Sequence, residues 1–216
     1  MKIGGLNRFS LSDFPSKVAA VVFTQGCNFS CPYCHNGCLI PEDVSSELLI
    51  PEEEFYEFLK VRRNKLNAVV VSGGEPTVHR DLPQFLRRIK AMDFAVKLDT
   101  NGSRPGMLRE LLKDKLVDYV AMDIKAPLHI YKTITRASTL RINEIKESIV
   151  LISKSGVDHQ FRTTVVQALL SEKDVQSIQK LVPAGSAHHL QRFCSKHALD
   201  PGLRKNNYLN LGGLQS

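Results

Sequence analysis

Six short apolar stretches alternate with segments of helical periodicity, and this alternation constrains the fold more than any other feature. The apolar stretches are residues 18–24, 68–72, 95–99, 119–123, 161–166 and 187–193. Amphipathic helices are expected at residues 51–63, 82–92, 106–115, 142–155 and 172–181. Such an alternation is typical of repeated βα units that build a mostly parallel, buried sheet. Because six units are too few to close an eight-stranded barrel, we predict an α/β fold, an open, partial (β/α)6 TIM-like barrel.

The length of 216 residues and the apolar share of 43% suit one sizeable domain with its own core. We place this domain at residues 1–199. Residues 200–216 lack periodicity and are rich in Gly and Asn, so we expect a loosely ordered C-terminal tail. No segment approaches the roughly 18 apolar residues of a membrane span, and the start of the chain lacks the apolar core of a secretory signal. We therefore expect a cytoplasmic protein with no membrane partner.

The chain carries 29 Lys and Arg against 22 Asp and Glu, which gives a net charge of +7. Such an excess is compatible with nucleic acid or with an acidic protein partner. The basic residues are spread over the expected helices, and the sequence shows no helix-turn-helix, RRM or aromatic–basic stacking pattern. We therefore do not expect a nucleic-acid partner.

Three cysteines, Cys27, Cys31 and Cys34, follow the first apolar stretch with the spacing C-x3-C-x2-C. Three thiolates on one short loop can hold three irons of a cubane [4Fe-4S] cluster and leave the fourth iron open to an exogenous molecule. An open iron indicates chemistry rather than storage. We predict a single cluster with these three ligands, because the following residues 37–66 contain only one further cysteine, Cys38.

A zinc site is the competing interpretation of this loop, and it requires four donors, with Cys38 or His35 as the nominal fourth. The second ligand pair that usually accompanies such a site is absent from the sequence. A disulfide framework is disfavoured, because the chain has five cysteines, an odd number, and no secretory segment is expected. The roles of Cys38 and Cys194 stay open.

Polar or glycine residues follow the apolar stretches, at what would be the carboxyl ends of parallel strands. Those ends meet at one rim of a βα barrel, so we expect these residues to lie together. Gly74 lets the backbone approach a ligand, since it has no Cβ. Asp99 and Asp123 end neighbouring strands and would repel each other unless a cation or an ammonium group lies between them. Lys125 returns to the face of Asp123 and can meet a ligand carboxylate.

Four motifs in this order resemble the radical S-adenosylmethionine superfamily, and within it the activating enzymes of glycyl radical enzymes. They are the three-cysteine motif with Tyr33 before its last cysteine, Gly73-Gly74-Glu75-Pro76, Leu98-Asp99-Thr100-Asn101-Gly102 and Met122-Asp123-Ile124-Lys125. Residues 2–15 and the sequence Cys34-His35-Asn36 are most similar to activating proteins of anaerobic ribonucleoside-triphosphate reductase. The resemblance extends over nearly the whole chain.

The resemblance implies an oxidoreductase that cleaves S-adenosylmethionine reductively to methionine and a 5'-deoxyadenosyl radical. That radical would take a hydrogen atom from a backbone glycine of a partner, a glycyl radical enzyme. A flavodoxin- or ferredoxin-type protein would supply the electron. Two other interpretations stay open: a radical enzyme that acts on a nucleic-acid base or a small molecule, and a zinc-stabilised binding module without catalysis.

The same resemblance places the residues that contact the cofactor, while no catalytic residue is assigned. The expected contacts are Tyr33, His35, Gly74, Glu75, Asp99, Thr100, Asp123, Lys125 and Arg162. Asp99, Thr100, Asp123 and Lys125 would contact S-adenosylmethionine or a nearby monovalent cation. Related activating enzymes also bring a histidine near the last strand to the ligand, and we expect Gln191 to take that place here.

Overall fold

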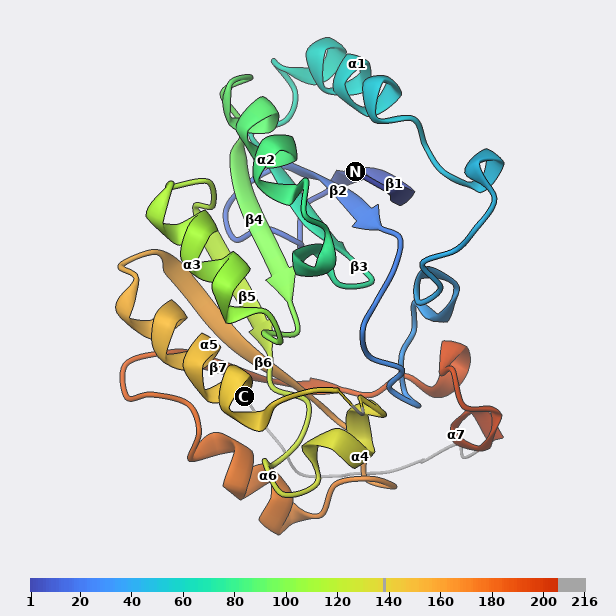
Figure 1. The fold of residues 1–216 in the computed structure, drawn as a ribbon, viewed down its shortest axis with the longest axis vertical. Helices are drawn as coiled ribbons and strands as arrows, with labels where there is room; N and C mark the ends of the chain where they lie inside the picture. Colours follow the sequence, from blue (N-terminus) through green and yellow to red (C-terminus); the bar gives the residue numbers. More distant parts are fainter. Residues whose placement is uncertain (138, 206–216) are drawn as a thin grey trace.

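The computed structural model describes residues 1–137 and 139–205, and its centre is a seven-stranded sheet (Figure 1). The strands follow one another in space in chain order. They are β1 (Ile3–Ser10), β2 (Ala19–Thr24), β3 (Ala68–Gly73), β4 (Ala95–Thr100), β5 (Tyr119–Asp123), β6 (Asp158–Val165) and β7 (Ala187–Arg192). Strands β2 to β7 pair in parallel, and the sheet does not close on itself. The predicted open, mostly parallel partial barrel is confirmed.

All six predicted strands are present, and the seventh, β1, was not predicted. It pairs antiparallel with β2 at the edge of the sheet, with Ile3 opposite Thr24 and Asn7 opposite Val21. Its central residues are half-buried or exposed. Two glycines and two polar residues interrupt its apolar pattern, so the sequence lacks the period-two signal of a half-buried strand.

Five predicted helices connect the parallel strands and cover one face of the sheet (Figure 1). They are α1 (Glu52–Arg62), α2 (Leu82–Lys90), α3 (Pro105–Lys113), α5 (Ile142–Lys154) and α6 (Glu172–Gln179). Two short helices, α4 (Tyr131–Thr135) and α7 (Pro201–Lys205), were not predicted. Helix α7 occupies the start of the expected tail, while residues 206–216 lie outside the described residues. Among the described helices, none has the length and apolar character needed to cross a bilayer.

The two faces of the sheet bury different kinds of side chain. On the outer face, alternate residues such as Val69 and Val71 pack with the helices into the main core. On the inner face, the first residues of the strands are apolar, and Val70 packs there against Phe14 from the loop between β1 and β2. The Phe14 ring also contacts Tyr119 at a centroid distance of 5.8 Å. The amino ends of β2 to β5 are thus filled by apolar groups on this face, and the charged side chains of Asp99 and Asp123 follow toward the carboxyl ends.

A glycine turn after β3 crosses the loop that leaves β2. The Gly74 N–H donates to the Thr24 carbonyl at 2.9 Å, and the Glu75 N–H donates to the Gly26 carbonyl at 2.8 Å. Gly73 has φ of +115°, a region that favours glycine. A Cβ on Gly74 would overlap the Gly26 carbonyl oxygen. The turn therefore needs glycine so that two segments of this chain can cross, a requirement that the sequence alone did not indicate.

We expect Gly74→Ala to lower the free energy of unfolding by roughly 1–3 kcal/mol, because the added methyl must displace the backbone at Gly26. Urea denaturation of the two proteins would measure the change. Gly106→Ala is the matched control: a Cβ there meets no atom within 4 Å, and the residue lies in the first turn of α3. Equal stability of the two alanine variants would contradict the proposed crossing constraint.

Candidate functional site

The three cysteines of the C-x3-C-x2-C motif lie on one loop at the carboxyl end of β2. Cys31 is buried, Cys27 and Cys34 are half-buried, and all three are free thiols. Burial raises the pKa of Cys27 to about 12 and that of Cys31 to about 11. The Phe29 N–H donates to the Cys27 sulfur at 3.4 Å. The loop thus presents three shielded sulfurs, one of which already accepts a backbone hydrogen bond.

This donor set fits a cubane cluster better than a single metal ion. Among the described residues, no three His, Cys, Asp or Glu side chains converge closely enough to hold one ion. A zinc site requires such a convergent, four-donor set, whereas the cysteines of a cubane each bind a different iron and lie further apart. Three soft thiols, one buried and two half-buried, are compatible with the second arrangement.

Hydrogen bonds fix the cysteine loop to the neighbouring elements. The Asn28 side chain donates to Ser103 Oγ at 2.7 Å, and its carbonyl oxygen accepts from the Asn101 side chain at 3.0 Å. The Ser30 N–H donates to the Thr135 carbonyl in α4 at 2.9 Å. The sequence prediction did not include Asn28, Asn101 or Ser103. Asn28 follows the first cysteine, and Asn101 and Ser103 follow the end of β4. These positions were the sequence signal that could have identified them.

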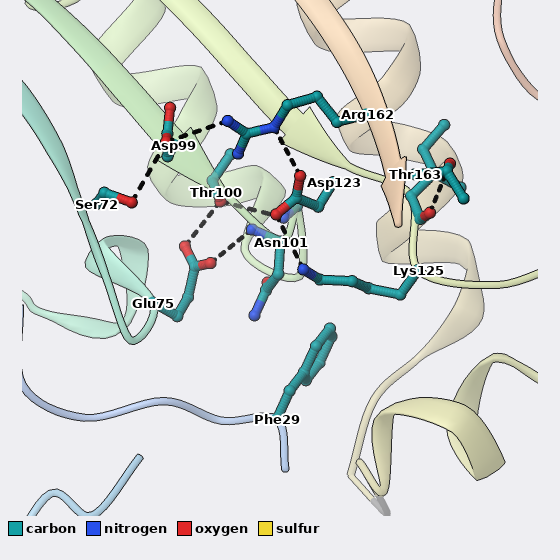
Figure 2. A network of polar contacts seen from close by, with 12 residues as sticks. Phe29, Ser72, Glu75, Asp99, Thr100, Asn101, Asp123, Lys125, Arg162 and Thr163 are labelled. Atoms are coloured by element: carbon teal, nitrogen blue, oxygen red, sulfur yellow. Dashed lines mark hydrogen bonds and ion pairs between the residues drawn. The ribbon is translucent and has the colours of Figure 1, made fainter. Parts of the chain in front are cut away.

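Glu75 is buried and accepts hydrogen bonds only from its own chain in the described structure. Its carboxylate accepts from the Thr77 N–H at 3.1 Å and from the Thr77 hydroxyl. It also accepts from Thr100 Oγ1 at 2.7 Å and from the Asn101 N–H at 2.6 Å (Figure 2). Burial raises the pKa of Glu75, although these four donors oppose the shift. Glu75 and Thr100 thus join the glycine turn after β3 to the end of β4.

A chain of five charged side chains, which we name the ionic chain, lines the inner face at the ends of β4, β5 and β6. Arg162 bridges Asp99 and Asp123: its Nη1 lies 3.2 Å from Asp99 Oδ2, and its Nε donates to Asp123 Oδ1 at 2.8 Å (Figure 2). Lys97 pairs with Asp99 at 2.5 Å, and Lys125 pairs with Asp123 at 2.9 Å. The cation expected between the two carboxylates is therefore the guanidinium of Arg162.

The ionic chain stabilises the charged forms of Asp123 and Lys125. Burial alone would raise the pKa of Asp123, but Arg162 and Lys125 outweigh it and hold that pKa well below its ordinary value. Burial would lower the pKa of Lys125, yet the nearby Asp123 charge raises it well above the ordinary value. Each of the three cations has a carboxylate partner, and the three cations exceed the two carboxylates by one positive charge. This excess favours an anionic partner at the partly buried rim.

Lys97 is a member of the ionic chain that the sequence prediction missed. It lies two residues before Asp99 in β4, so both side chains point to the inner face. Its residue is only 2% exposed, although lysine is almost never fully buried without a partner. The signal was therefore present as one lysine inside the apolar stretch that forms β4. Ser72, which donates to Asp99 at 3.3 Å, was missed as well.

The two predicted contacts that follow Cys31 lie on opposite sides of the loop. Tyr33 is buried, and its hydroxyl donates to the Lys125 carbonyl at 3.5 Å, so the ring lies beside the ionic chain. His35 is exposed, and its Nε2 lies 2.5 Å from the Cys194 carbonyl oxygen. Its ring stacks on Phe193 with a centroid distance of 5.8 Å. His35 thus anchors the loop to the segment after β7.

The last strand, β7, presents two polar side chains to the inner face. Gln191 pairs with Thr164 and His189 pairs with Arg162 in the parallel register, so these residues share the face of the ionic chain. His188 points to the other face, where its Nε2 lies 3.0 Å from Thr163 Oγ1. The ligand contact expected of Gln191 stays a prediction, and His189 on the same face is a second candidate that the sequence prediction did not single out.

Comparisons with known proteins agree with this geometry. The family model described as "Radical SAM superfamily" matches residues 21–182. A protein of Methanocaldococcus jannaschii named "Putative glycyl-radical enzyme activating enzyme" is 36% identical over 210 residues, which are 94% of this chain and 84% of the relative. A protein of Sulfurisphaera tokodaii named "Probable GTP 3',8-cyclase" is 31% identical over 75% of this chain and 50% of the relative.

The fold is also that of a solved structure described as native anSMEcpe with bound AdoMet. The similarity has a TM-score of 0.60 at 17% identity, over 79% of this chain and 49% of the other. The matched family model spans most of the strands, all three cysteines and the whole ionic chain. On these grounds, the chain belongs to the radical SAM superfamily.

Proposed function

We propose that this protein activates a glycyl radical enzyme, with Cys27, Cys31 and Cys34 as the ligands of one [4Fe-4S] cluster. The observation that carries the proposal is the position of the cysteine loop against the ionic chain, where Tyr33 lies between the cysteines and Lys125. When bound, the cluster and S-adenosylmethionine supply the 5'-deoxyadenosyl radical. The relative from Methanocaldococcus jannaschii supports this branch of the superfamily.

The ionic chain would bind the methionine part of S-adenosylmethionine. Its excess positive charge suits the ligand carboxylate, for which Lys125 is the best placed cation because it lies beside Tyr33 of the cysteine loop. Asp99 and Asp123 would hold Arg162 and Lys125 in position and balance their charges. The Arg162 guanidinium bridges the two carboxylates, and the monovalent cation expected near Asp99, Thr100 and Asp123 stays a prediction.

The remaining predicted contacts surround this part of the rim. Gly74 would offer its carbonyl to the ligand amino group, while Glu75 and Thr100 would act by fixing the turn and the end of β4. Tyr33 would pack beside the nucleoside, and His35 would present its ring edge to the adenine. All of these residues lie on the cysteine loop or at the carboxyl ends of the strands.

The open edge of the sheet suits a protein substrate. The strand order does not return from β7 to β1, so the barrel leaves a lateral opening. A partner's backbone loop with its glycine could enter there, which a closed barrel would prevent. We propose anaerobic ribonucleoside-triphosphate reductase as that partner and a flavodoxin- or ferredoxin-type protein as the electron donor.

The decisive test combines iron analysis with EPR spectroscopy. Protein reconstituted without oxygen should contain about four irons per chain. After reduction and addition of S-adenosylmethionine, it should produce the doublet of a glycyl radical on anaerobic ribonucleoside-triphosphate reductase. The signal should be lost with Cys31→Ala and with alanine at the partner's radical glycine. Cleavage of S-adenosylmethionine without a doublet on any candidate partner would instead favour a nucleotide or small-molecule substrate, and colourless zinc-loaded protein would reject the enzyme.

The burial of Lys97 beside Asp99 predicts that its replacement will weaken the binding of S-adenosylmethionine. Lys97→Met leaves the buried Asp99 carboxylate with Arg162 as its only ionic partner, so Arg162 should shift toward Asp99 and away from the ligand site. We expect S-adenosylmethionine to bind the reconstituted variant roughly tenfold more weakly, measured by calorimetry, with unchanged iron content.

Two further variants separate this effect from general damage. Lys90→Met makes the same replacement at a lysine that pairs with Asp118 on the surface, and its affinity should stay close to that of the original protein. Lys97→Met should also lower the free energy of unfolding, because the Asp99 carboxylate loses one of its two cations. The double variant Lys97→Met/Asp99→Asn should regain part of that free energy, because it has no carboxylate at residue 99. If Lys97→Met binds the cofactor normally, the proposed role of the ionic chain is wrong.

A further inference from the structure

A groove on the helical side of the molecule carries charges that the cofactor site does not use. It has a volume of about 600 Å³ and lies between the turn after β3 and the first turns of α3 and α5. Its charged lining residues are Arg80, Arg104, Arg141, Glu144 and Glu147. We name this feature the arginine groove.

Two of the three arginines are not neutralised. Glu144 pairs with Arg141 at 2.6 Å, and Glu147 pairs with Arg109 outside the groove. Across residues 1–137 and 139–205, neither Arg80 nor Arg104 has a carboxylate within ion-pair distance. Both residues are exposed. The arginine groove therefore presents two free guanidinium groups to a partner.

The start of α3 adds to the positive potential of the arginine groove. This helix begins after Arg104 with Pro105 in its first turn, and it has no side-chain cap and no acidic residue there. The amino end of a helix carries partial positive charge, and nothing in the first turn offsets it. The start of α3 therefore favours acidic groups of a partner over basic ones.

The side of the arginine groove that Arg104 forms is connected to the cysteine loop. Arg104 follows Ser103, whose hydroxyl accepts from the Asn28 side chain at 2.7 Å. Asn28 in turn follows Cys27. One hydrogen bond and two pairs of neighbouring residues thus join the arginine groove to a proposed cluster ligand. The ionic chain, in contrast, lies on the inner face of the sheet, away from the helices.

From these observations we propose that the arginine groove docks a small acidic one-electron donor protein, an inference that rests on the proposed function. A reduced flavin or iron–sulfur centre in the donor gives up one electron, the oxidised cluster accepts it, and no covalent bond forms or breaks. Electron-transfer encounters need only small interfaces, and complementary charge accelerates them. Because docking takes place on the outer face, it leaves the inner face free for cofactor and substrate.

The test compares two double variants with the same change in net charge. Arg80→Glu/Arg104→Glu reverses the charge of the arginine groove. Arg62→Glu/Lys113→Glu does so in the last turns of α1 and α3, at the opposite end of the strands. Reconstituted proteins are mixed with reduced flavodoxin in a stopped-flow instrument, and flavin absorbance gives the second-order rate constant. Binding of oxidised flavodoxin, measured by calorimetry, is the readout that needs no radical chemistry.

We expect the groove variant to react roughly tenfold or more slowly at low ionic strength and to bind oxidised flavodoxin correspondingly weakly. The difference should shrink in high salt, because screening removes attraction between exposed charges. The control variant should stay within about twofold of the original protein. Ferredoxin, used in place of flavodoxin, should show the same pattern, since the recognised chemistry is the acidic surface.

Three results would overturn the docking proposal. They are an unchanged rate in the groove variant, an equal loss in the control variant, and slower reduction of the groove variant by dithionite, which would indicate a damaged cluster. Weaker binding of the glycyl radical enzyme instead of the donor would assign the arginine groove to the substrate protein. Failure of the proposed function is a separate result: the original protein, reduced by dithionite, would not cleave S-adenosylmethionine although the donor still binds.

Discussion

The bridge that Arg162 makes between Asp99 and Asp123 is the interaction on which the inner face depends. Two carboxylates at the ends of neighbouring strands cannot both stay ionised in a buried site unless a cation lies between them. Arg162 meets that need from the third strand, with contacts of 3.2 and 2.8 Å. The bridge thereby ties together β4, β5 and β6 at the edge where their apolar residues end.

The ionic chain would let this edge bind the proposed charged ligand without rearranging. Each carboxylate is already oriented by two cations, so little conformational freedom is left to lose when a ligand arrives. Lys97 and Lys125 lie at the two ends of the chain, and only Lys125 is close to Tyr33 and the cysteine loop. The excess positive charge is therefore available at the end of the ionic chain that faces the proposed cluster.

Much of this arrangement could be predicted from the sequence, because burial leaves a clear pattern. Strands β2, β3 and β5 are largely apolar on both faces. The ends of parallel strands must meet at one rim, which placed Asp99, Asp123 and Lys125 together. Strand β1 escaped prediction because it is a half-exposed edge strand. Lys97 was not predicted because a lysine is almost never fully buried without a partner, and its pair with Asp99, two residues further along the same strand, was not considered.

The sequence also did not indicate which groups donate hydrogen bonds to the carboxylate oxygens of Glu75. Glu75 is charged and follows a glycine turn, which suits a ligand contact, yet its oxygens are taken by donors from Thr77, Thr100 and Asn101. Whether a carboxylate faces a ligand or its own chain depends on the register between β3 and β4, and that register follows from the packing of the whole sheet.

The inner face and the helical face of the sheet suit different partners. The proposed cluster loop lies at the carboxyl rim, so it can be approached from the inner face and from the helical face. The inner face carries paired charges in a buried setting, which suits a bound cofactor. The helical face carries Arg80 and Arg104 without carboxylate partners in the described structure, which suits a transient acidic protein. Two separate routes to one loop would let the proposed enzyme receive an electron while its substrate is in place.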